Sequence, residues 1–415
     1  MPQVTDSRHT ARAAFAYRDF TLFQAARFLI VLAAEMQSVA VGWQVYELTH
    51  RPLDLGLVGL AQFLPGILLF LVAGHTADRV DRRKIISFCY GGFAICAALL
   101  LTITLRGGTS VYPIYVTLLL LGIVRSFNGP AGQSLLPQLV PEEHFENAVA
   151  WGASVFQAAT ILGPTLGGLL YAVAHGPGAV YVLALLSFAS AFVAALLIRP
   201  IRKVRVQRRT SLRTLLAGFG YIWQSKIILG SISLDLFAVL LGGAVALLPV
   251  YAREILHTGP WGLGLLRSAP GIGAAVTAVM VAHWPLRRRA GVTMLWCVAG
   301  FGIFTIAFGL SRSLVLSLVS LLLVGATDMV SVIVRGTLVQ LATPDEMRGR
   351  VSAVNMLFIG ASNEFGQFES GVTAQWLGAV PAVVLGGIGT LIVVSLWAWW
   401  FPSLRRVDAL SSVRQ

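Results

Sequence analysis

The sequence contains a series of long, nearly uninterrupted apolar segments, each about as long as a bilayer is thick. A helix that crosses the hydrocarbon core needs about 20 mostly apolar residues, and roughly a dozen such segments fit into the 415 residues. Only 12% of the residues are charged, against roughly 25% in a soluble protein. Because lipid offers the backbone no water, these segments must form helices or a closed barrel. Their apolar runs are continuous rather than alternating, which favours helices.

Twelve membrane-spanning helices are therefore expected, with both chain ends on the same side of the membrane. The predicted spans are residues 20–46, 53–77, 84–105, 111–136, 147–174, 178–198, 227–251, 262–284, 291–310, 314–341, 351–377 and 380–401.

The net charge of +13 is concentrated on one side of these spans. With a cytoplasmic N-terminus, 23 of the 31 Lys and Arg residues fall in cytoplasmic segments and four in external loops. This is the positive-inside distribution, so anionic lipids rather than nucleic acid are the expected partners of the charge. The polar, basic residues 1–19 lack the apolar core of a signal peptide and predict a cytoplasmic tail. The three cysteines lie in apolar segments and are expected to be core residues, and no metal site or cofactor is expected.

A basic connector divides the chain into two halves of six spans. The predicted organisation is an N-terminal tail (1–19), an N-terminal bundle (20–198), the connector (199–226), a C-terminal bundle (227–401) and a C-terminal tail (402–415). Within the connector, residues 211–224 carry apolar residues at helical spacing. This spacing predicts an amphipathic helix on the membrane surface, with a disordered basic linker as the alternative.

The two halves also repeat in sequence. Leu118–Gly122 matches Leu321–Gly325 at an offset of 203 residues, and Pro65–Ile67 matches Pro270–Ile272 near an offset of 205. A repeat of half the chain predicts two parallel, pseudo-symmetric bundles around an axis normal to the membrane. In that arrangement a substrate site is expected between the halves, near the midplane.

The segment Gly74–Lys84, between the second and third spans, has the spacing G-x-x-x-D-R-x-x-R-R-K. It resembles the loop between helices 2 and 3 of the major facilitator superfamily of transporters. The resemblance implies a cytoplasmic gate, whose charge pairs break when the two halves rock. A basic loop that only sets the topology is the alternative, and Asp81 stands where the family usually has Gly. The gate residues carried over by the resemblance are Gly74, Asp78, Arg79, Arg82 and Arg83.

Two further motifs resemble the same superfamily. In the fourth span, Arg125 and Asn128 match a motif whose Arg is implicated in proton coupling, with a structural role in the bundle as the alternative. The fifth span matches the core of a motif associated with antiporters, with plain helix packing as the alternative. The matching residues of the fifth span are Gly163, Pro164, Gly167 and Gly168.

Over its whole length the chain resembles a major facilitator transporter, closest to the exporters that include the enterobactin exporter. The resemblance implies an all-α membrane protein of twelve helices in two six-helix bundles, in the cytoplasmic (inner) membrane of a bacterium. It also implies a monomer without a cofactor. The branch is indicated by Val45–Thr49, Ser211–Phe219 and Pro344–Val351.

Ionisable residues inside the spans are candidates for proton coupling or for lining the cavity, because burying them is costly. Desolvation favours the neutral form of a carboxylic acid, as proton-coupled exchange requires. Asp328 and Arg335, seven residues apart, lie close to one helix face, about 10 Å apart along it. We rank Glu35 and Asp328 first, Asp235 and Glu369 next and Glu364 last, with a structural ion pair as the alternative for each. Arg27, like Arg125, is a cation within a span.

Together these features predict export of a small amphipathic molecule, such as a siderophore or a drug, driven by inward proton movement. An ATP-driven pump is disfavoured, because a phosphate-binding loop needs Gly-Lys and none of Lys84, Lys203 or Lys226 follows a Gly. An enzyme is disfavoured because no nucleophile or metal constellation occurs. Proton-coupled uptake and a non-transporting membrane receptor or scaffold are the alternatives.

Overall fold

The computed structural model describes residues 12–199, 212–284 and 289–407; the side chains of Leu71, Asp78, residues 212–215 and Asp345 are outside this description. Most of the predicted N-terminal tail, the basic stretch 200–211 of the connector and residues 408–415 of the C-terminal tail also lie outside it. Within the described ranges the chain is helical without strands, and eleven segments are long and apolar enough to cross a membrane. Those of the first half are α2 (Arg18–Thr49), α3 (Pro52–Arg79), α4 (Arg82–Leu105), α5 (Tyr112–Leu135), α6 (Phe145–Val173) and α7 (Gly178–Leu197). Those of the second half are Lys226–Ile255, α11 (Gly259–His283), α12 (Ala290–Leu310), α13 (Leu314–Leu341) and α15 (Ala379–Trp400).

A twelfth long helix, α14 (Asp345–Leu377), covers the segment predicted as the eleventh span. It has 33 residues but is less apolar than the other eleven, because its second half carries several amides and acids. The predicted all-α fold of twelve membrane-spanning helices is thereby confirmed. The polar residues that distinguish α14 are Asn355, Asn363, Glu364, Gln367 and Glu369.

The predicted seventh span, 227–251, is present as the membrane-spanning segment Lys226–Ile255, but this segment is not one continuous helix. Helix α9 (Lys226–Gly242) ends at Gly243, whose φ of −70° and ψ of 57° are not helical. The chain then continues through short helical pieces and ends in a π-helical turn, η5 (Tyr251–Ile255). Pro249, without a backbone N–H, lies in this irregular part, and π-turns often occur at functional sites. The short pieces are η4 (Ala244–Leu247) and α10 (Leu248–Val250).

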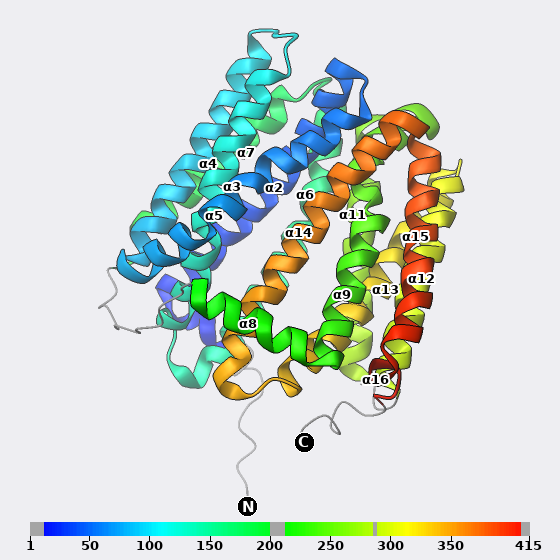
Figure 1. Cartoon of the computed structure of the whole chain (residues 1–415). Coiled ribbons are helices and arrows are strands. Elements are labelled where there is room, and N and C mark those ends of the chain that lie inside the picture. Colours follow the sequence, from blue (N-terminus) through cyan, green and yellow to red (C-terminus); the bar gives the residue numbers. More distant parts are fainter. Residues whose placement is uncertain (1–11, 200–211, 285–288, 408–415) are drawn as a thin grey trace, which may run out of the picture. The chain divides into compact units, whose positions relative to one another are not determined.

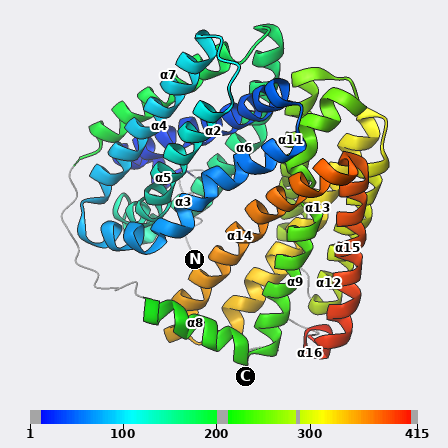
Figure 2. The same cartoon turned by 45° about the horizontal axis from the view of Figure 1, so that its top comes forward.

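Contacts divide the chain into two compact units. Unit 1 comprises Met1–Val41 and Ala61–Arg209, and in it α4 lies beside α5 and α7 (Figure 1). Unit 2 comprises Gly42–Leu60 and Thr210–Gln415, and in it α12 lies beside α13 and α15 (Figure 2). The segment Gly42–Leu60, where α2 ends and α3 begins, thus packs with the second half of the sequence rather than the first.

The sequence repeat corresponds to the same helix crossing in both units. A Cβ on Gly122 of α5 would overlap the Gln62 carbonyl and touch Pro65 of α3. In unit 2, a Cβ on Gly325 of α13 would overlap the Pro270 carbonyl of α11. The matched Gly and Pro residues therefore occupy equivalent crossings, at which a missing side chain lets two helix backbones approach closely.

The predicted amphipathic helix is present as α8 (Leu212–Gln224), which crosses the N-terminal part of α14 (Figure 1). Phe219 packs edge to face on Phe358 at 5.4 Å between ring centroids, and the Tyr221 hydroxyl donates to the Ala342 carbonyl at 2.9 Å. Trp223 stays 77% exposed. Part of the apolar face of α8 thus packs on α14, which belongs to the same unit. The placement of α8 on a membrane surface stays a prediction.

Candidate functional site

The second half of the chain contains a buried charge cluster built from α9 and α13. Arg335 of α13 donates from Nη1 to Oδ2 of Asp235 on α9, and the two residues are only 3% and 5% exposed. Asp328, two helical turns before Arg335 on α13, lies close enough to interact electrostatically with both. We call Asp235, Asp328 and Arg335 the acidic cluster. Asp328 and Arg335 lie close to one face of α13, as predicted. The acid that binds the Arg335 guanidinium directly is Asp235 of α9.

The acidic cluster holds two carboxyl groups and one guanidinium. Arg335 is committed to Asp235, so an ionised Asp328 would leave one uncompensated negative charge at low dielectric. Such a charge is costly, and a single proton on Asp328 removes the cost. In this arrangement Asp328 can bind and release one proton while the ion pair between Arg335 and Asp235 stays intact.

The first half contains a different cluster around Arg27 of α2. The Arg27 guanidinium carbon lies 5.8 Å from the ring centroid of Phe156 on α6, and the guanidinium interacts electrostatically with the buried Tyr90 of α4. Arg27 Nη1 and Gln24 Nε2 lie 3.0 and 3.2 Å from the position that a Cβ on Gly152 of α6 would occupy. We call Gln24, Arg27, Tyr90, Gly152 and Phe156 the Arg27 cluster. Among the described residues, no carboxylate oxygen lies within 4 Å of this guanidinium.

Two turns beyond Arg27, Glu35 lies where α2 packs on α6. A Cβ on Gly163 of α6 would lie 2.5 Å from Glu35 Cβ, and one on Gly167 would lie 2.7 Å from Met36 Cα. These two glycines of the fifth-span motif, beside the buried Pro164 and Gly168, let the helices approach at the turn that carries Glu35. The packing interpretation of this motif therefore has a direct structural basis.

The remaining intramembrane candidates belong to neither cluster. On α5, Arg125 is exposed and Asn128 half-buried. On α14, Glu369 accepts a hydrogen bond from Thr373 Oγ1 at 2.7 Å. Glu364 accepts one from Gln367 Nε2 at 3.4 Å and lies against Gly59 of α3.

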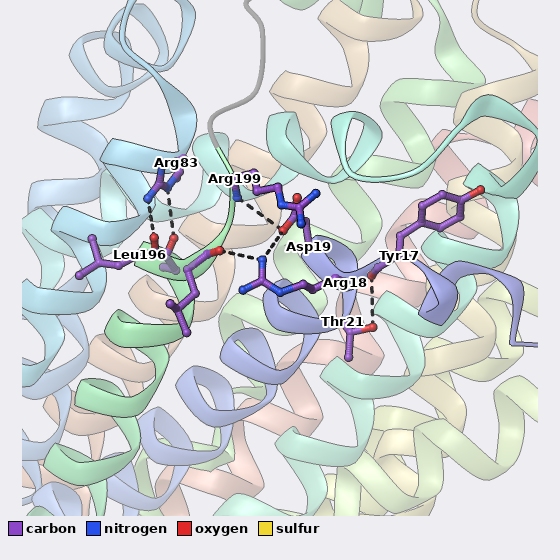
Figure 3. A network of polar contacts seen from close by, with 9 residues as sticks. Tyr17, Arg18, Asp19, Thr21, Arg83, Leu196 and Arg199 are labelled. Atoms are coloured by element: carbon purple, nitrogen blue, oxygen red, sulfur yellow. Dashed lines mark hydrogen bonds and ion pairs between the residues drawn. The ribbon is translucent and has the colours of Figure 1, made fainter.

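At the end of unit 1 where α3 meets α4, the predicted gate residues have distinct surroundings, and Figure 3 shows one of them, Arg83, beside Leu196. Arg83 donates to the carbonyls of Ala195 and Leu196 at 3.4 and 2.5 Å, and so satisfies carbonyls that the end of α7 leaves unpaired. Asp81, the departure from the family pattern, caps α4 by accepting from the Arg83 backbone N–H at 3.0 Å. The side chain of Asp78 lies outside the described residues. Of the others, Gly74 lies in α3, Arg79 ends α3 and Arg82 begins α4.

Sequence reasoning missed a polar contact in unit 2 at the end of α2. The buried Tyr46 donates its hydroxyl hydrogen bond to Glu254 of η5, and Arg253 lies 6.0 Å from the Trp43 ring centroid. Tyr46 and Glu254 are 208 residues apart in the sequence, so no local pattern indicates this hydrogen bond. Gln24 was also missed, although it lies one turn before Arg27 on α2 and this i, i+3 spacing was visible.

Comparisons with known proteins give one consistent family. The sequence pattern of the family described as Major Facilitator Superfamily matches residues 25–367. The enterobactin exporter EntS of Shigella boydii serotype 4 is 28% identical over 384 residues, which cover 92% of this chain and 91% of that protein. EntS of Citrobacter koseri has the same identity and coverage, and EntS of Escherichia coli O1:K1 / APEC is 27% identical.

Solved structures share the fold. A POT family transporter in complex with 5-aminolevulinic acid has a TM-score of 0.74 at 11% identity, over 93% of this chain and 96% of that one. A bacterial homolog of the human lysosomal transporter Spinster, inward-facing and occupied, has a TM-score of 0.70 at 13% identity, over 96% and 98%. At these identities the likeness concerns the fold alone.

Proposed function

Because the chain belongs to the major facilitator superfamily, whose members are membrane transporters and not enzymes, we propose that it exports a small amphipathic molecule in exchange for protons. The likeness to enterobactin exporters over 92% of the chain supports the outward direction. We further propose a monomer in a bacterial inner membrane, with both termini cytoplasmic, as the distribution of Lys and Arg indicates.

The acidic cluster is the observation that carries the proton-coupling part of the proposal. Its single guanidinium balances one of two carboxylates, so Asp328 is the group whose protonation changes the net charge of the cluster. A proton that binds there removes a charge from a low-dielectric site, and its release restores the charge. A conformational change that alters the access of water to Asp328 would therefore exchange protons across the membrane.

The other candidates take supporting roles in this proposal. Glu35, Arg125 and Asn128 in unit 1, with Glu364 and Glu369 on α14, are candidates for lining the cavity or for a second proton step. The segment from Gly74 to Arg83 is proposed as the cytoplasmic gate. Its Arg83 contact on α7 anchors the start of α4. Asp78 is proposed as the charge whose pairing breaks when the two halves rock, as the family resemblance implies.

Exchange is testable in inside-out membrane vesicles, with dansyl-labelled amphiphiles as transported probes. We expect wild-type vesicles to accumulate probe when a proton gradient is imposed that makes the vesicle interior acidic. The Asp328→Asn variant should lose at least about 90% of this accumulation, because the amide cannot release a proton. Exchange of labelled for unlabelled probe without a gradient should persist, since it needs no proton step.

The matched control is Glu143→Gln, which makes the same chemical change at an exposed residue outside both clusters. Gradient-driven accumulation by Asp328→Asn at normal protein level would contradict the coupling role. If vesicles failed to accumulate probe while intact cells took it up in a gradient-dependent way, proton-coupled uptake would replace export.

A further inference from the structure

The Arg27 cluster contains a cation in a membrane-spanning helix that has no acidic partner among the described residues. Arginine inside a span is costly and is normally paired with a carboxylate or carbonyl, as Arg335 is paired with Asp235. For Arg27 no carboxylate within 4 Å occurs in the part of the chain that the structure describes. Its described neighbours are an aromatic ring, a phenol and a carboxamide, none of which carries the opposite charge.

Gln24 adds an independent sign that an acceptor is missing. Its side chain is 2% exposed, and neither Nε2 nor Oε1 has a hydrogen-bond partner in the described part of the chain. Buried polar atoms are nearly always hydrogen-bonded, so an unpartnered carboxamide indicates a position that a ligand can fill. Gln24 Nε2 and Arg27 Nη1 lie 3.2 and 3.0 Å from the position that a Cβ on Gly152 would occupy, so the two donors lie close together beside the α6 backbone and can share one acceptor.

The glycine at position 152 gives the two donor side chains room beside α6. Any other amino acid would place a Cβ 3.0 and 3.2 Å from the two donors, which would have to move by a few tenths of an ångström. Phe156, one turn further along α6, lies against the guanidinium and offers an apolar ring beside the charged group. The arrangement therefore combines two polar donors, one of them cationic, with the aromatic ring of Phe156.

We propose that Arg27 and Gln24 bind an oxygen anion, a carboxylate or an ionised acidic phenol, of an amphipathic molecule whose apolar part packs on Phe156. The guanidinium supplies charge-assisted hydrogen bonds and the carboxamide a neutral one, and both suit an oxygen acceptor. A cationic amphiphile would be repelled by Arg27. The inference rests on the proposed function only in treating the bound molecule as the exported one, because binding itself requires no proton step.

Equilibrium binding to purified protein in phosphatidylcholine nanodiscs tests the proposal with dansyl-glycine and dansyl-glycinamide. These fluorescent probes share an aromatic body and differ in the carboxylate. We expect wild-type protein to bind the carboxylate at least about tenfold more tightly, as a charged hydrogen bond in a desolvated site provides. Arg27→Gln should abolish that preference, and Arg27→Lys should retain part of it.

Gly152→Ala is the second variant and keeps both donors, so it tests the site even if Arg27→Gln folds poorly. Its added methyl group should weaken binding of dansyl-glycine several-fold. The matched control is Gly132→Ala, because a Cβ on that α5 glycine meets nothing within 4 Å. Competition by short-chain phosphatidylglycerol, lost in Arg27→Gln, would show that a lipid phosphate can also supply the anion.

Wild-type protein that binds both probes equally, or neither, would overturn the proposal, and so would a carboxylate preference that survives in Arg27→Gln and Gly152→Ala. Asp328→Asn separates this result from the proposed function. We expect it to retain the carboxylate preference although it loses gradient-driven transport, so anion binding and proton exchange can fail independently.

Discussion

The acidic cluster and the Arg27 cluster each place one arginine within the membrane-spanning helices, but they differ in how its charge is balanced. Arg335 is bound by Asp235 and has Asp328 as a second acid nearby. Arg27 has no described acid within 4 Å and faces Gln24, Tyr90 and Phe156 instead. One cluster therefore carries a surplus acid and the other a surplus cation.

This difference matters because the two halves share a scaffold. The Gly and Pro crossings of α3 with α5 and of α11 with α13 are equivalent, whereas the charged residues are not conserved between the halves. In the repeat, Asp328 of α13 corresponds to Arg125 of α5, so an acid in one half stands where the other half has a cation. The packing of a repeat can thus persist while its charges diverge, and the two proposals assign a proton to one half and an anion to the other.

The largest expected effect comes from removing the cation of the acidic cluster. Arg335→Met leaves two carboxyl groups without their guanidinium, and breaking a buried ion pair in this way costs about 3–5 kcal/mol of unfolding free energy. Chemical denaturation of the purified protein in detergent measures the loss. Adding Asp235→Leu in the same chain should restore most of it, because the buried charge is then removed as a pair.

The control for this comparison is Arg51→Gln. Arg51 is paired with Asp54 at 3.9 Å, but its side chain is 58% exposed. The Asp54 side chain is only 10% exposed, but a pair at this distance whose guanidinium stays in solvent contributes about 0–1 kcal/mol. Equal losses for Arg335→Met and Arg51→Gln would mean that the buried pair has no special energetic role.

A smaller effect is expected at the shared helix crossings. Gly122→Ala and Gly325→Ala should each destabilise their unit by about 1–3 kcal/mol, because the added methyl group overlaps a carbonyl of the neighbouring helix. Denaturation measures both variants, with Gly336→Ala as control, since a Cβ there meets nothing within 4 Å. Similar losses would support an equivalent scaffold, whereas a loss in one half alone would argue against it.

The helical architecture was predictable because long apolar runs in lipid allow few backbone solutions. The seventh span was harder, since its break at Gly243 depends on a single residue leaving the helical conformation within an otherwise continuous apolar run. Glycine is common in membrane helices, so its presence alone did not indicate a break. Helix α14 was predicted as a span because its segment is long and mostly uncharged, although it contains several amides and acids.

The sites were less predictable because their partners are distant in sequence. Asp328 and Arg335 share one helix, so spacing alone placed them on one face. The direct partner of Arg335 is Asp235, 100 residues away, and nothing local indicates that pair. In the Arg27 cluster, convergence on Gly152 depends on how α6 packs against α2, which the sequence does not specify.

The smallest and most discriminating effect is expected at Arg27 itself. Arg27→Gln removes a cation that has no described acid within 4 Å, so no carboxylate is left uncompensated. The unfolding free energy should stay within about 1 kcal/mol of wild type, and any change should be towards greater stability, because the desolvation cost of the charge disappears. Denaturation beside Arg335→Met makes the comparison direct. A loss at Arg27→Gln as large as that at Arg335→Met would mean that Arg27 is balanced by an acid after all, and the contrast between the two clusters would then fail. A small change, together with the loss of the carboxylate preference, would separate a ligand-binding arginine from a structural one.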